Sequence, residues 1–154
     1  EYGGTGWTPV QKYIFAGECA FAHTPRIVPF GLAMVGPVIY TFGNAEQKAR
    51  FLPDILCGRA AWCQLCSEPV AGSDLAGLQT RAVRDGDEWR VTGQKVWTSS
   101  GHISDLGMLI ARTDPDAPKR RGITYFLVDM RQPGIENVFD IEVNSTVISI
   151  APGT

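Results

Sequence analysis

The spacing of apolar residues changes near Gly58, from a helical period to an alternating one. Before this point apolar side chains recur every three or four residues, as they do on one face of a helix. After it, short β-branched and aromatic runs alternate with polar residues and end at turn residues, as in strands with one buried face. The change predicts an α+β fold, with N-terminal helices packed on a mainly antiparallel, β-barrel-like domain.

Three helices are predicted in the first third of the chain. The first begins at Thr8-Pro9, because threonine caps helices well and proline fits the first helical position. The second covers Gly31 to Thr41 and is apolar nearly all round, so it should be buried. The third begins at Asn44, which has a glutamine three residues later as in a capping box, and Pro53 should kink or restart it.

The clearest hairpin pairs residues 80–84 with residues 88–92. An Asp85-Gly86 turn separates these two alternating runs, and aspartate followed by glycine is a strong signal for a tight hairpin turn. Alternation along the second run puts Trp89 and Val91 on one face of the sheet.

Two further strands are predicted at residues 106–112 and 123–129, and both are apolar enough to be central in the sheet. The Pro/Asp/Lys-rich loop between them, residues 114–122, should be exposed. Residues 138–150 alternate loosely and carry no functional motif.

The 154 residues are enough for one ordinary domain or two small packed lobes. We divide them into a helical part (residues 1–60), a β domain (residues 61–137) and a divergent tail (residues 138–154). The chain begins at Glu1, inside a glycine-rich turn, with no initiating methionine and no leader, which suggests a fragment.

Composition argues against several classes of protein. A hydrophobic fraction of 44% and a charged fraction of 19% are typical of a globular protein rather than a disordered one. A net charge of −2 argues against a nucleic-acid-binding surface. The longest apolar runs are too short to span a bilayer, so no membrane span is expected.

Four cysteines raise the question of a metal site or a disulfide. Cys63 and Cys66 form a single Cys-x-x-Cys pair in a predicted strand, residues 61–66, where residues three apart face opposite sides. Two thiols on opposite faces cannot ligate one zinc ion, and no second pair or nearby histidine completes a site. We expect no metal, reduced thiols and a cytoplasmic protein.

A loop of small residues, Glu68 to Asp74, has a carboxylate at each end. Its Gly72-Ser73 step would let backbone N–H groups approach a phosphate closely. The two carboxylates would repel a phosphate, so they should turn back and bond local backbone N–H groups. Neither a Walker lysine nor Gly-x-Gly-x-x-Gly is present, and spacing alone favours an ordinary loop.

A second polar segment, Gly93 to Ser99, brings an indole close to two hydroxyls. Trp97 is either core filling or a stacking platform, and taken alone it is more typical of core. Ser67 and Ser99 suit either a heteroaromatic ligand or backbone contacts. Glu68 precedes a proline, which holds it extended and favours a fixed structural contact over catalysis.

These blocks together resemble the acyl-CoA dehydrogenase family. Residues 62–74 look like its first signature and Gly93-Gln94-Lys95-Val96-Trp97 like its second, while residues 2–6 and 44–53 are similar to further blocks. The resemblance runs from residue 1 to about Ile135, less than half of a full-length member. It implies the end of the N-terminal helical domain followed by the middle β domain. The sequence near residues 62–64 is most similar to bacterial members that handle dicarboxylyl or steroid-derived thioesters.

The resemblance implies FAD as the cofactor and an acyl-CoA thioester as the substrate. Ser67 and Ser99 would bond the isoalloxazine edge, Trp97 would pack on the ring, and Ser73 would reach the acyl-CoA as well as the flavin. The full set of implied flavin contacts is Gln64, Cys66, Ser67, Gly72, Ser73, Trp97, Thr98 and Ser99. The family reaction is α,β-dehydrogenation, with a carboxylate base from a C-terminal helical domain that this chain lacks, so no catalytic residue is predicted here.

The resemblance also implies an electron-transfer flavoprotein or similar acceptor, and a homo- or hetero-oligomer at full length. We expect the chain alone to bind FAD poorly and not to turn over. Two alternatives stay open: a non-catalytic partner subunit that keeps the fold, and a sister flavin oxidase or monooxygenase built on the same middle domain.

Overall fold

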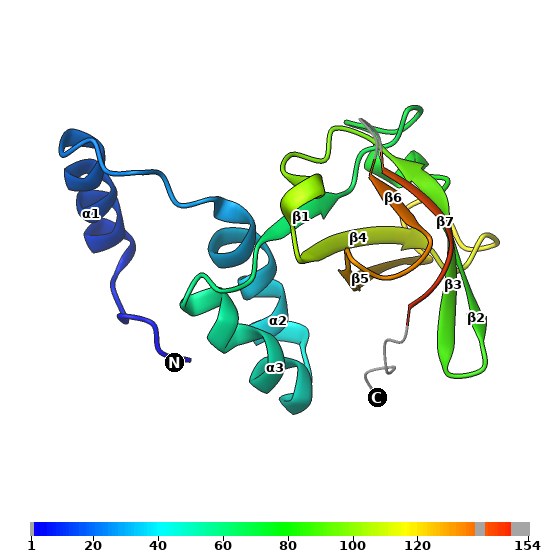
Figure 1. The fold of residues 1–154 in the computed structure, drawn as a ribbon, viewed down its shortest axis with the longest axis horizontal. Helices are drawn as coiled ribbons and strands as arrows, with labels where there is room; N and C mark the ends of the chain where they lie inside the picture. Colours follow the sequence, from blue (N-terminus) through cyan, green and yellow to red (C-terminus); the bar gives the residue numbers. More distant parts are fainter. Residues whose placement is uncertain (1, 138–140, 149–154) are drawn as a thin grey trace. The chain divides into compact units, whose positions relative to one another are not determined.

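The structure is a computed structural model that describes residues 2–137 and 141–148. The chain divides into two compact units, Glu1–Arg59 and Ala60–Thr154 (Figure 1). The described part of the first unit is helical, and the second holds all the described strands. The mixed α+β class predicted from the change in apolar spacing is therefore confirmed.

The first unit contains α1 (Pro9–Phe21), a π-helical segment (Phe30–Val35), α2 (Gly36–Phe42) and α3 (Ala45–Leu56). Both predicted helix starts are confirmed. The Thr8 side chain accepts from the Gln11 N–H, and the Gln11 side chain accepts from the Thr8 N–H, which is a complete capping box. Asn44 and Gln47 form the same reciprocal pair at α3.

The second predicted helix differs from expectation in two ways. It forms as the π-helical segment followed by α2, and it is buried on one side only. Val35 and Ile39 are buried, but Leu32 and Phe42 are exposed, Phe42 by 82%. The helix contacts α3 along one face, so a sequence that is apolar all round is only partly covered in this unit. Pro53 lies inside α3 without ending it.

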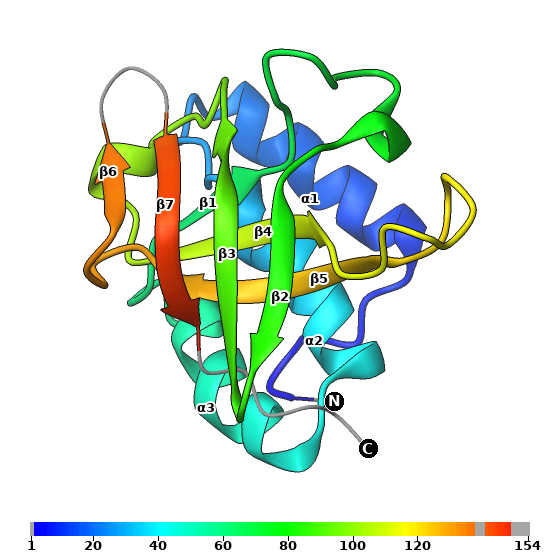
Figure 2. The same ribbon diagram turned by 90° about the vertical axis from the view of Figure 1, so that its right-hand side faces the viewer.

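The second unit is a curled sheet of seven strands: β1 (Trp62–Leu65), β2 (Arg81–Asp85), β3 (Glu88–Lys95), β4 (Leu106–Arg112), β5 (Ile123–Asp129), β6 (Ile135–Asn137) and β7 (Ile141–Ile148). Its strand order is β1-β4-β2-β3-β7-β6, with β5 paired to β4. Figure 2 shows β2, β3 and β7 crossing in front of β4 and β5, as expected of a sheet that curls toward a barrel. Only β1 and a single residue of β2 pair with β4 in parallel, so the sheet is mainly antiparallel.

The β2–β3 hairpin is confirmed, with its turn one residue later than predicted. Asp85 pairs with Glu88, which leaves Gly86 and Asp87 as the two-residue loop. Gly86 has a φ of +62°, a conformation that glycine adopts without strain and that matches the twist of a tight hairpin.

The prediction of two central strands is correct for β4 and wrong for β5. β4 has neighbours on both sides, whereas β5 pairs with β4 alone among the described strands. β5 is apolar for another reason. Its Phe126 and Val128 side chains are buried in the hydrophobic core that the sheet encloses, so their burial does not require a strand on each side of β5. The loop 114–122 is mostly exposed, as predicted.

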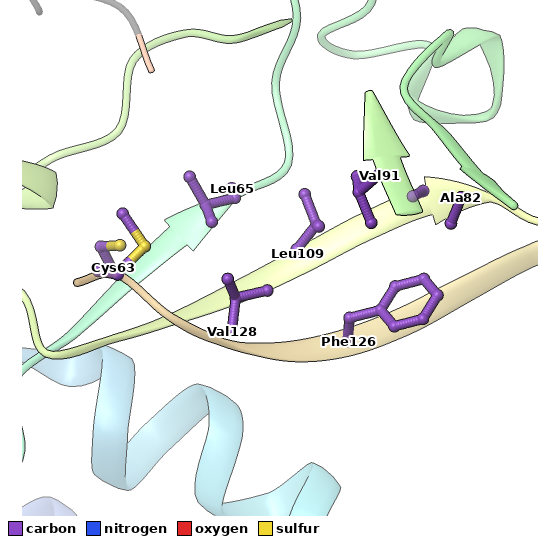
Figure 3. Packing of buried hydrophobic residues seen from close by; sticks show 9 residues of the cluster. Cys63, Leu65, Ala82, Val91, Leu109, Phe126 and Val128 are labelled. Atoms are coloured by element: carbon purple, nitrogen blue, oxygen red, sulfur yellow. The ribbon is translucent and has the colours of Figure 1, made fainter. Parts of the chain in front are cut away.

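The core of the second unit lies on the concave face of the sheet. Trp89 and Val91 of β3 point to this face, as predicted, and the Trp89 ring meets the Phe126 ring edge-on at 5.5 Å between centroids. Figure 3 shows side chains from β1, β2, β3, β4 and β5 converging there. The cluster comprises Cys63, Leu65, Ala82, Val91, Leu109, Ala111, Phe126, Val128 and Met130.

Cys63 belongs to this core, and its burial raises the pKa of the thiol to about 11. Cys66 lies just beyond the end of β1, so the strand is shorter than the predicted residues 61–66. All four cysteines are free thiols.

The predicted divergent tail, residues 138–154, lies partly outside the described residues. Its described portion forms β7, which pairs antiparallel with β3 and β6 and so extends the sheet. Among the residues that the structure describes, no helix is both long enough and apolar enough to cross a membrane.

Candidate functional site

The two segments predicted to hold the flavin are joined in the structure. One follows the end of β1 and the other follows the end of β3, strands that are not neighbours in the sheet. The Val96 N–H donates to the Ser67 carbonyl oxygen at 2.9 Å. Ser67 therefore lies beside the residue that directly precedes Trp97. The tertiary fold therefore makes neighbours of two stretches that are almost thirty residues apart in the sequence.

The loop that begins at Glu68 is held from inside. Glu68 and Ala71 exchange backbone bonds of 2.8 and 3.1 Å across a tight turn. The Glu68 carboxylate, 6% exposed, accepts from the Gln79 N–H at 2.6 Å and the Thr80 N–H at 3.0 Å. The structural interpretation of Glu68 is confirmed, although its backbone donors come from the approach to β2 rather than from its own loop.

Asp74, at the other end of the loop, behaves differently from the prediction. Its carboxylate pairs with the Lys119 ammonium of the exposed loop 114–122 instead of turning back on the local backbone. Both side chains are more than half exposed, so this pair contributes little stability.

Lys95 is the residue of this region that sequence reasoning missed. Its side chain is fully buried, and its ammonium donates to Glu68 Oε1 at 2.7 Å and to the Cys66 carbonyl oxygen at 3.2 Å. Strand alternation was the available signal, because residues 91, 93 and 95 share the inner face of β3 and a lysine there needs a buried acid.

Burial and hydrogen bonding act on these two charges in different ways. Burial lowers the pKa of the Lys95 ammonium, and the adjacent Glu68 carboxylate offsets part of this change. Burial alone would raise the pKa of Glu68, but hydrogen bonds from Gln79 and Lys95 outweigh it and hold the Glu68 pKa below its usual value. The Glu68 carboxylate is therefore charged at neutral pH, and its ion-pair partner is the Lys95 ammonium.

Trp97 is 87% exposed, so its interpretation as core filling is wrong. Its φ of +59° is unusual for a bulky residue and occurs two residues after the end of β3. Bonds from the Ser99 N–H to the Trp97 oxygen (3.0 Å) and from the Gly101 N–H to the Thr98 oxygen (3.1 Å) hold the turn. Ser100 is also left-handed, at +64°. Strained residues of this kind are concentrated at functional sites.

The remaining predicted flavin contacts differ in their exposure to solvent. Gly72, Ser73 and Ser99 are exposed, whereas four residues are half-buried: Gln64, Cys66, Ser67 and Thr98. Burial raises the pKa of the Cys66 thiol, which keeps this thiol neutral at neutral pH.

The chemistry of the Trp97–Ser99 segment fits a flat, hydrogen-bonding cofactor such as a flavin. The Thr98 Oγ1 atom is buried and has no hydrogen-bond partner among the residues that the structure describes, which is costly for a hydroxyl. Beside it lie an exposed indole, suited to stacking, and the exposed hydroxyl of Ser99. Within the described residues no cluster of side chains could hold a metal ion.

Comparison with known proteins identifies the family. Residues 1–59 match the acyl-CoA dehydrogenase N-terminal domain, and residues 63–144 match the acyl-CoA dehydrogenase middle domain. The chain belongs to the acyl-CoA dehydrogenase family. The match continues to residue 144, beyond Ile135 where the resemblance was expected to end, and it includes part of β7.

The most similar relatives include acyl-CoA dehydrogenase FadE34 of Mycobacterium tuberculosis, 50% identical over 86% of this chain and 19% of that protein. Acyl-CoA dehydrogenase IpdE1 of the same organism is 42% identical over 88% of this chain and 36% of its own length. The chain thus spans well under half the length of these relatives.

Two similar solved structures confirm the fold. The ChsE4–ChsE5 complex from Mycobacterium tuberculosis matches 95% of this chain and 40% of that chain, with a TM-score of 0.82 and 39% identity. The Tcur3481–Tcur3483 steroid ACAD matches 88% of this chain and 35% of its own, with a TM-score of 0.82 and 40% identity.

Proposed function

We propose that this chain is the flavin-binding portion of an FAD-dependent acyl-CoA dehydrogenase that oxidises an acyl-CoA thioester at its α,β bond. One observation carries the proposal: the Val96–Ser67 hydrogen bond joins the loop after β1 to the segment that presents the exposed Trp97. Family membership supports the same assignment.

The proposed roles follow from exposure and chemistry. The Trp97 indole would stack against the isoalloxazine, and the Ser67, Thr98 and Ser99 hydroxyls would bond its polar edge. Gln64 and Cys66 would complete the wall beside the ring. The exposed Gly72-Ser73 step would let backbone N–H groups approach the pyrophosphate, and the Ser73 hydroxyl would also contact the acyl-CoA.

Bound FAD would supply the acceptor for a hydride from Cβ, while the Cα proton would pass to a base. Glu68 does not serve as this base, because its carboxylate is buried and already accepts from Lys95 and from two backbone N–H groups. We infer that the base comes from a part of the protein that the family provides in a C-terminal domain. The chain by itself should bind FAD weakly and show no turnover.

The substrate class that we propose is a steroid-derived or dicarboxylyl thioester. A structural relative with 40% identity is described as a steroid ACAD, which supports the steroid-derived class. We further propose an electron-transfer flavoprotein or similar acceptor as the partner, oligomer formation at full length, and a cytoplasmic location. The ChsE4–ChsE5 relative is itself a complex, which supports the oligomer.

A sister oxidase is the second candidate function. A structural relative of lower identity, 27% with a TM-score of 0.70, is a prolyl acyl carrier protein oxidase. The same flavin surface would serve either reaction. Reaction of the reduced, full-length flavoprotein with oxygen separates the two, because an oxidase reoxidises rapidly in air and a dehydrogenase does not. A third candidate, the non-catalytic partner subunit, would bind no flavin.

Titration of the purified chain with FAD, followed by flavin and tryptophan fluorescence, tests the proposal. Base–aromatic stacking contributes roughly 1–3 kcal/mol, so Trp97→Ala should weaken binding by about tenfold or more. Phe21→Ala removes an equally exposed aromatic ring from α1 and should leave FAD affinity unchanged. Absence of saturable binding by the unaltered chain would contradict the assignment.

A further inference from the structure

The Lys95 ammonium lies where the two proposed flavin segments meet. Its side chain is 0% exposed and that of Glu68 is 3% exposed. The ammonium donates to the Cys66 carbonyl, one residue before Ser67. The next residue after Lys95 is Val96, whose N–H donates to Ser67. A hydrogen bond from the Lys95 ammonium and a backbone hydrogen bond from Val96 therefore connect residues 95–96 to residues 66–67.

Glu68 extends this connection to a third stretch. Its carboxylate accepts from the backbone N–H groups of Gln79 and Thr80, directly before β2. Thr80 in turn packs tightly on β3, because a Cβ atom added at Gly93 would come within 2.3 Å of the Thr80 hydroxyl oxygen. These contacts hold three stretches of chain together: residues 66–68, 79–80 and 93–96.

Stability alone does not explain a buried ion pair at this place. Removing two charges from water has a desolvation cost that their attraction does not reliably repay, and an apolar pair of similar volume is often as stable. Fixing one geometry among alternatives is a better-attested use of such pairs. Neither side chain is exposed to a ligand, so a direct catalytic role is excluded for both.

We propose that Lys95 and Glu68 are positioning residues of the flavin site, an inference that rests on the proposed function. Their ion pair sets the spacing between the Ser67 hydroxyl on one segment and the Trp97 indole on the other. A flat cofactor held from both segments is sensitive to such spacing, because supporting groups must keep contact residues close to one productive geometry.

The decisive variant is the double substitution Lys95→Met/Glu68→Gln, which removes both charges and approximately keeps side-chain volume. Either single substitution leaves a buried charge without its partner, which destabilises the fold for a different reason. Asp85→Asn is the matched control, since it breaks the exposed Asp85–Arg90 ion pair of the β2–β3 hairpin.

FAD affinity and thermal unfolding are measured on the same samples. The double variant should unfold cooperatively and bind FAD about tenfold more weakly, which is 1.4 kcal/mol. Asp85→Asn should match the unaltered chain in both measurements. A folded double variant with unchanged FAD affinity would overturn the proposal. Loss of cooperative unfolding would overturn it too, because the pair would then be required for the fold itself.

Amide hydrogen exchange, measured by NMR, tests the positioning role independently of FAD binding. If the unaltered chain binds no FAD, the proposed function fails and the Val96 amide becomes the deciding probe. The double variant should exchange the Val96 N–H about tenfold faster, by the same 1.4 kcal/mol, with amides of the β4–β5 pairing unchanged as internal reference. Equal protection of Val96 in both proteins would contradict the positioning role.

Discussion

Single residues decide how closely β3 approaches the start of β2. At Gly93 an added Cβ would lie 2.3 Å from the Thr80 hydroxyl and 2.7 Å from the Thr80 Cα. Two residues further along the same face, Lys95 reaches the Glu68 carboxylate. Alternation alone predicts apolar side chains on the inner face of β3. Instead, Gly93 allows close approach of the Thr80 backbone, and Lys95 bonds to the loop that contains Glu68.

Gly93→Ala should destabilise the second unit by about 1–3 kcal/mol, because the added methyl group would meet the Thr80 Cα, a backbone atom that cannot rotate away, as well as the Thr80 side chain. Urea unfolding measures the change. Thr92→Ala is the control on the adjacent, exposed position of the same strand and should stay within about 0.5 kcal/mol of the unaltered chain. A Gly93→Ala chain as stable as its Thr92→Ala counterpart would show that the approach of Thr80 is not rigid.

Glu68 should give the folded chain a recognisable acid dependence. Because its folded pKa lies below the usual value of 4.5, the folded state binds fewer protons than the unfolded state in acid. Its contribution to stability is complete above about pH 4.5 and is lost as the pH falls through the folded pKa.

Urea midpoints measured from neutral pH down to acid test this dependence. The double substitution Lys95→Met/Glu68→Gln should flatten the acid slope without leaving an unpaired buried charge, whereas Asp85→Asn, which alters an exposed pair, should leave it unchanged. Identical slopes for the double variant and the unaltered chain would show that the Glu68 carboxylate does not carry this dependence.

Helices of the first unit differ in what their packing contributes. α3 buries Leu52 and Ile55, whereas no residue of α1 is buried. Both helices nevertheless begin with the same reciprocal capping arrangement. Local capping therefore defines where each helix starts, and tertiary contacts determine whether the helix adds to the stability of the unit.

Paired cap substitutions separate the two contributions. Asn44→Ala should lower the free energy of unfolding by about 1 kcal/mol, because α3 is part of the packed core of its unit. Thr8→Ala removes an equivalent cap from α1 and should reduce helicity without moving the urea midpoint. Circular dichroism and urea unfolding, recorded together, measure both effects. Equal midpoint shifts in the two variants would mean that α1 is packed in solution.

Many large apolar side chains are exposed among the residues that the structure describes, and most of these belong to the first unit. On α1 alone these are Val10, Tyr13, Ile14, Phe15 and Phe21. Exposed apolar surface of this extent is unusual for a free-standing protein and is typical of a surface that meets further protein. The chain spans 19% of FadE34 and 36% of IpdE1, relatives that are much longer.

We expect the isolated chain to associate as its concentration rises. Tyr13 and Phe21, 81% and 85% exposed, should contribute most on α1, so Tyr13→Ser/Phe21→Ser should lower the average mass seen by light scattering. Val83→Ser, at an exposed apolar site on β2, is the control and should change little. A monomeric unaltered chain at all concentrations would contradict this expectation.

Local signals in the sequence were sufficient for the capped helix starts, the β2–β3 hairpin and the strands β4 and β5. Caps at Thr8 and Asn44, the glycine of the β2–β3 turn, and alternation in β3, β4 and β5 each depend on neighbours within a few residues, so their physics is readable without coordinates. The family blocks likewise identified both domains of the acyl-CoA dehydrogenase match.

Long-range contacts were beyond the reach of such signals. The exposure of Trp97, the edge position of β5 and the burial of Lys95 each depend on which distant segment covers the residue, and local sequence is compatible with either outcome. The Lys95–Glu68 bond joins positions 27 residues apart, and its formation depends on β1 and β3 ending near each other. The amino-acid order determined the capped helix starts, the β2–β3 hairpin and the family, whereas the folded sheet decided which polar groups meet, because a buried charge is tolerated only beside a partner that the fold supplies.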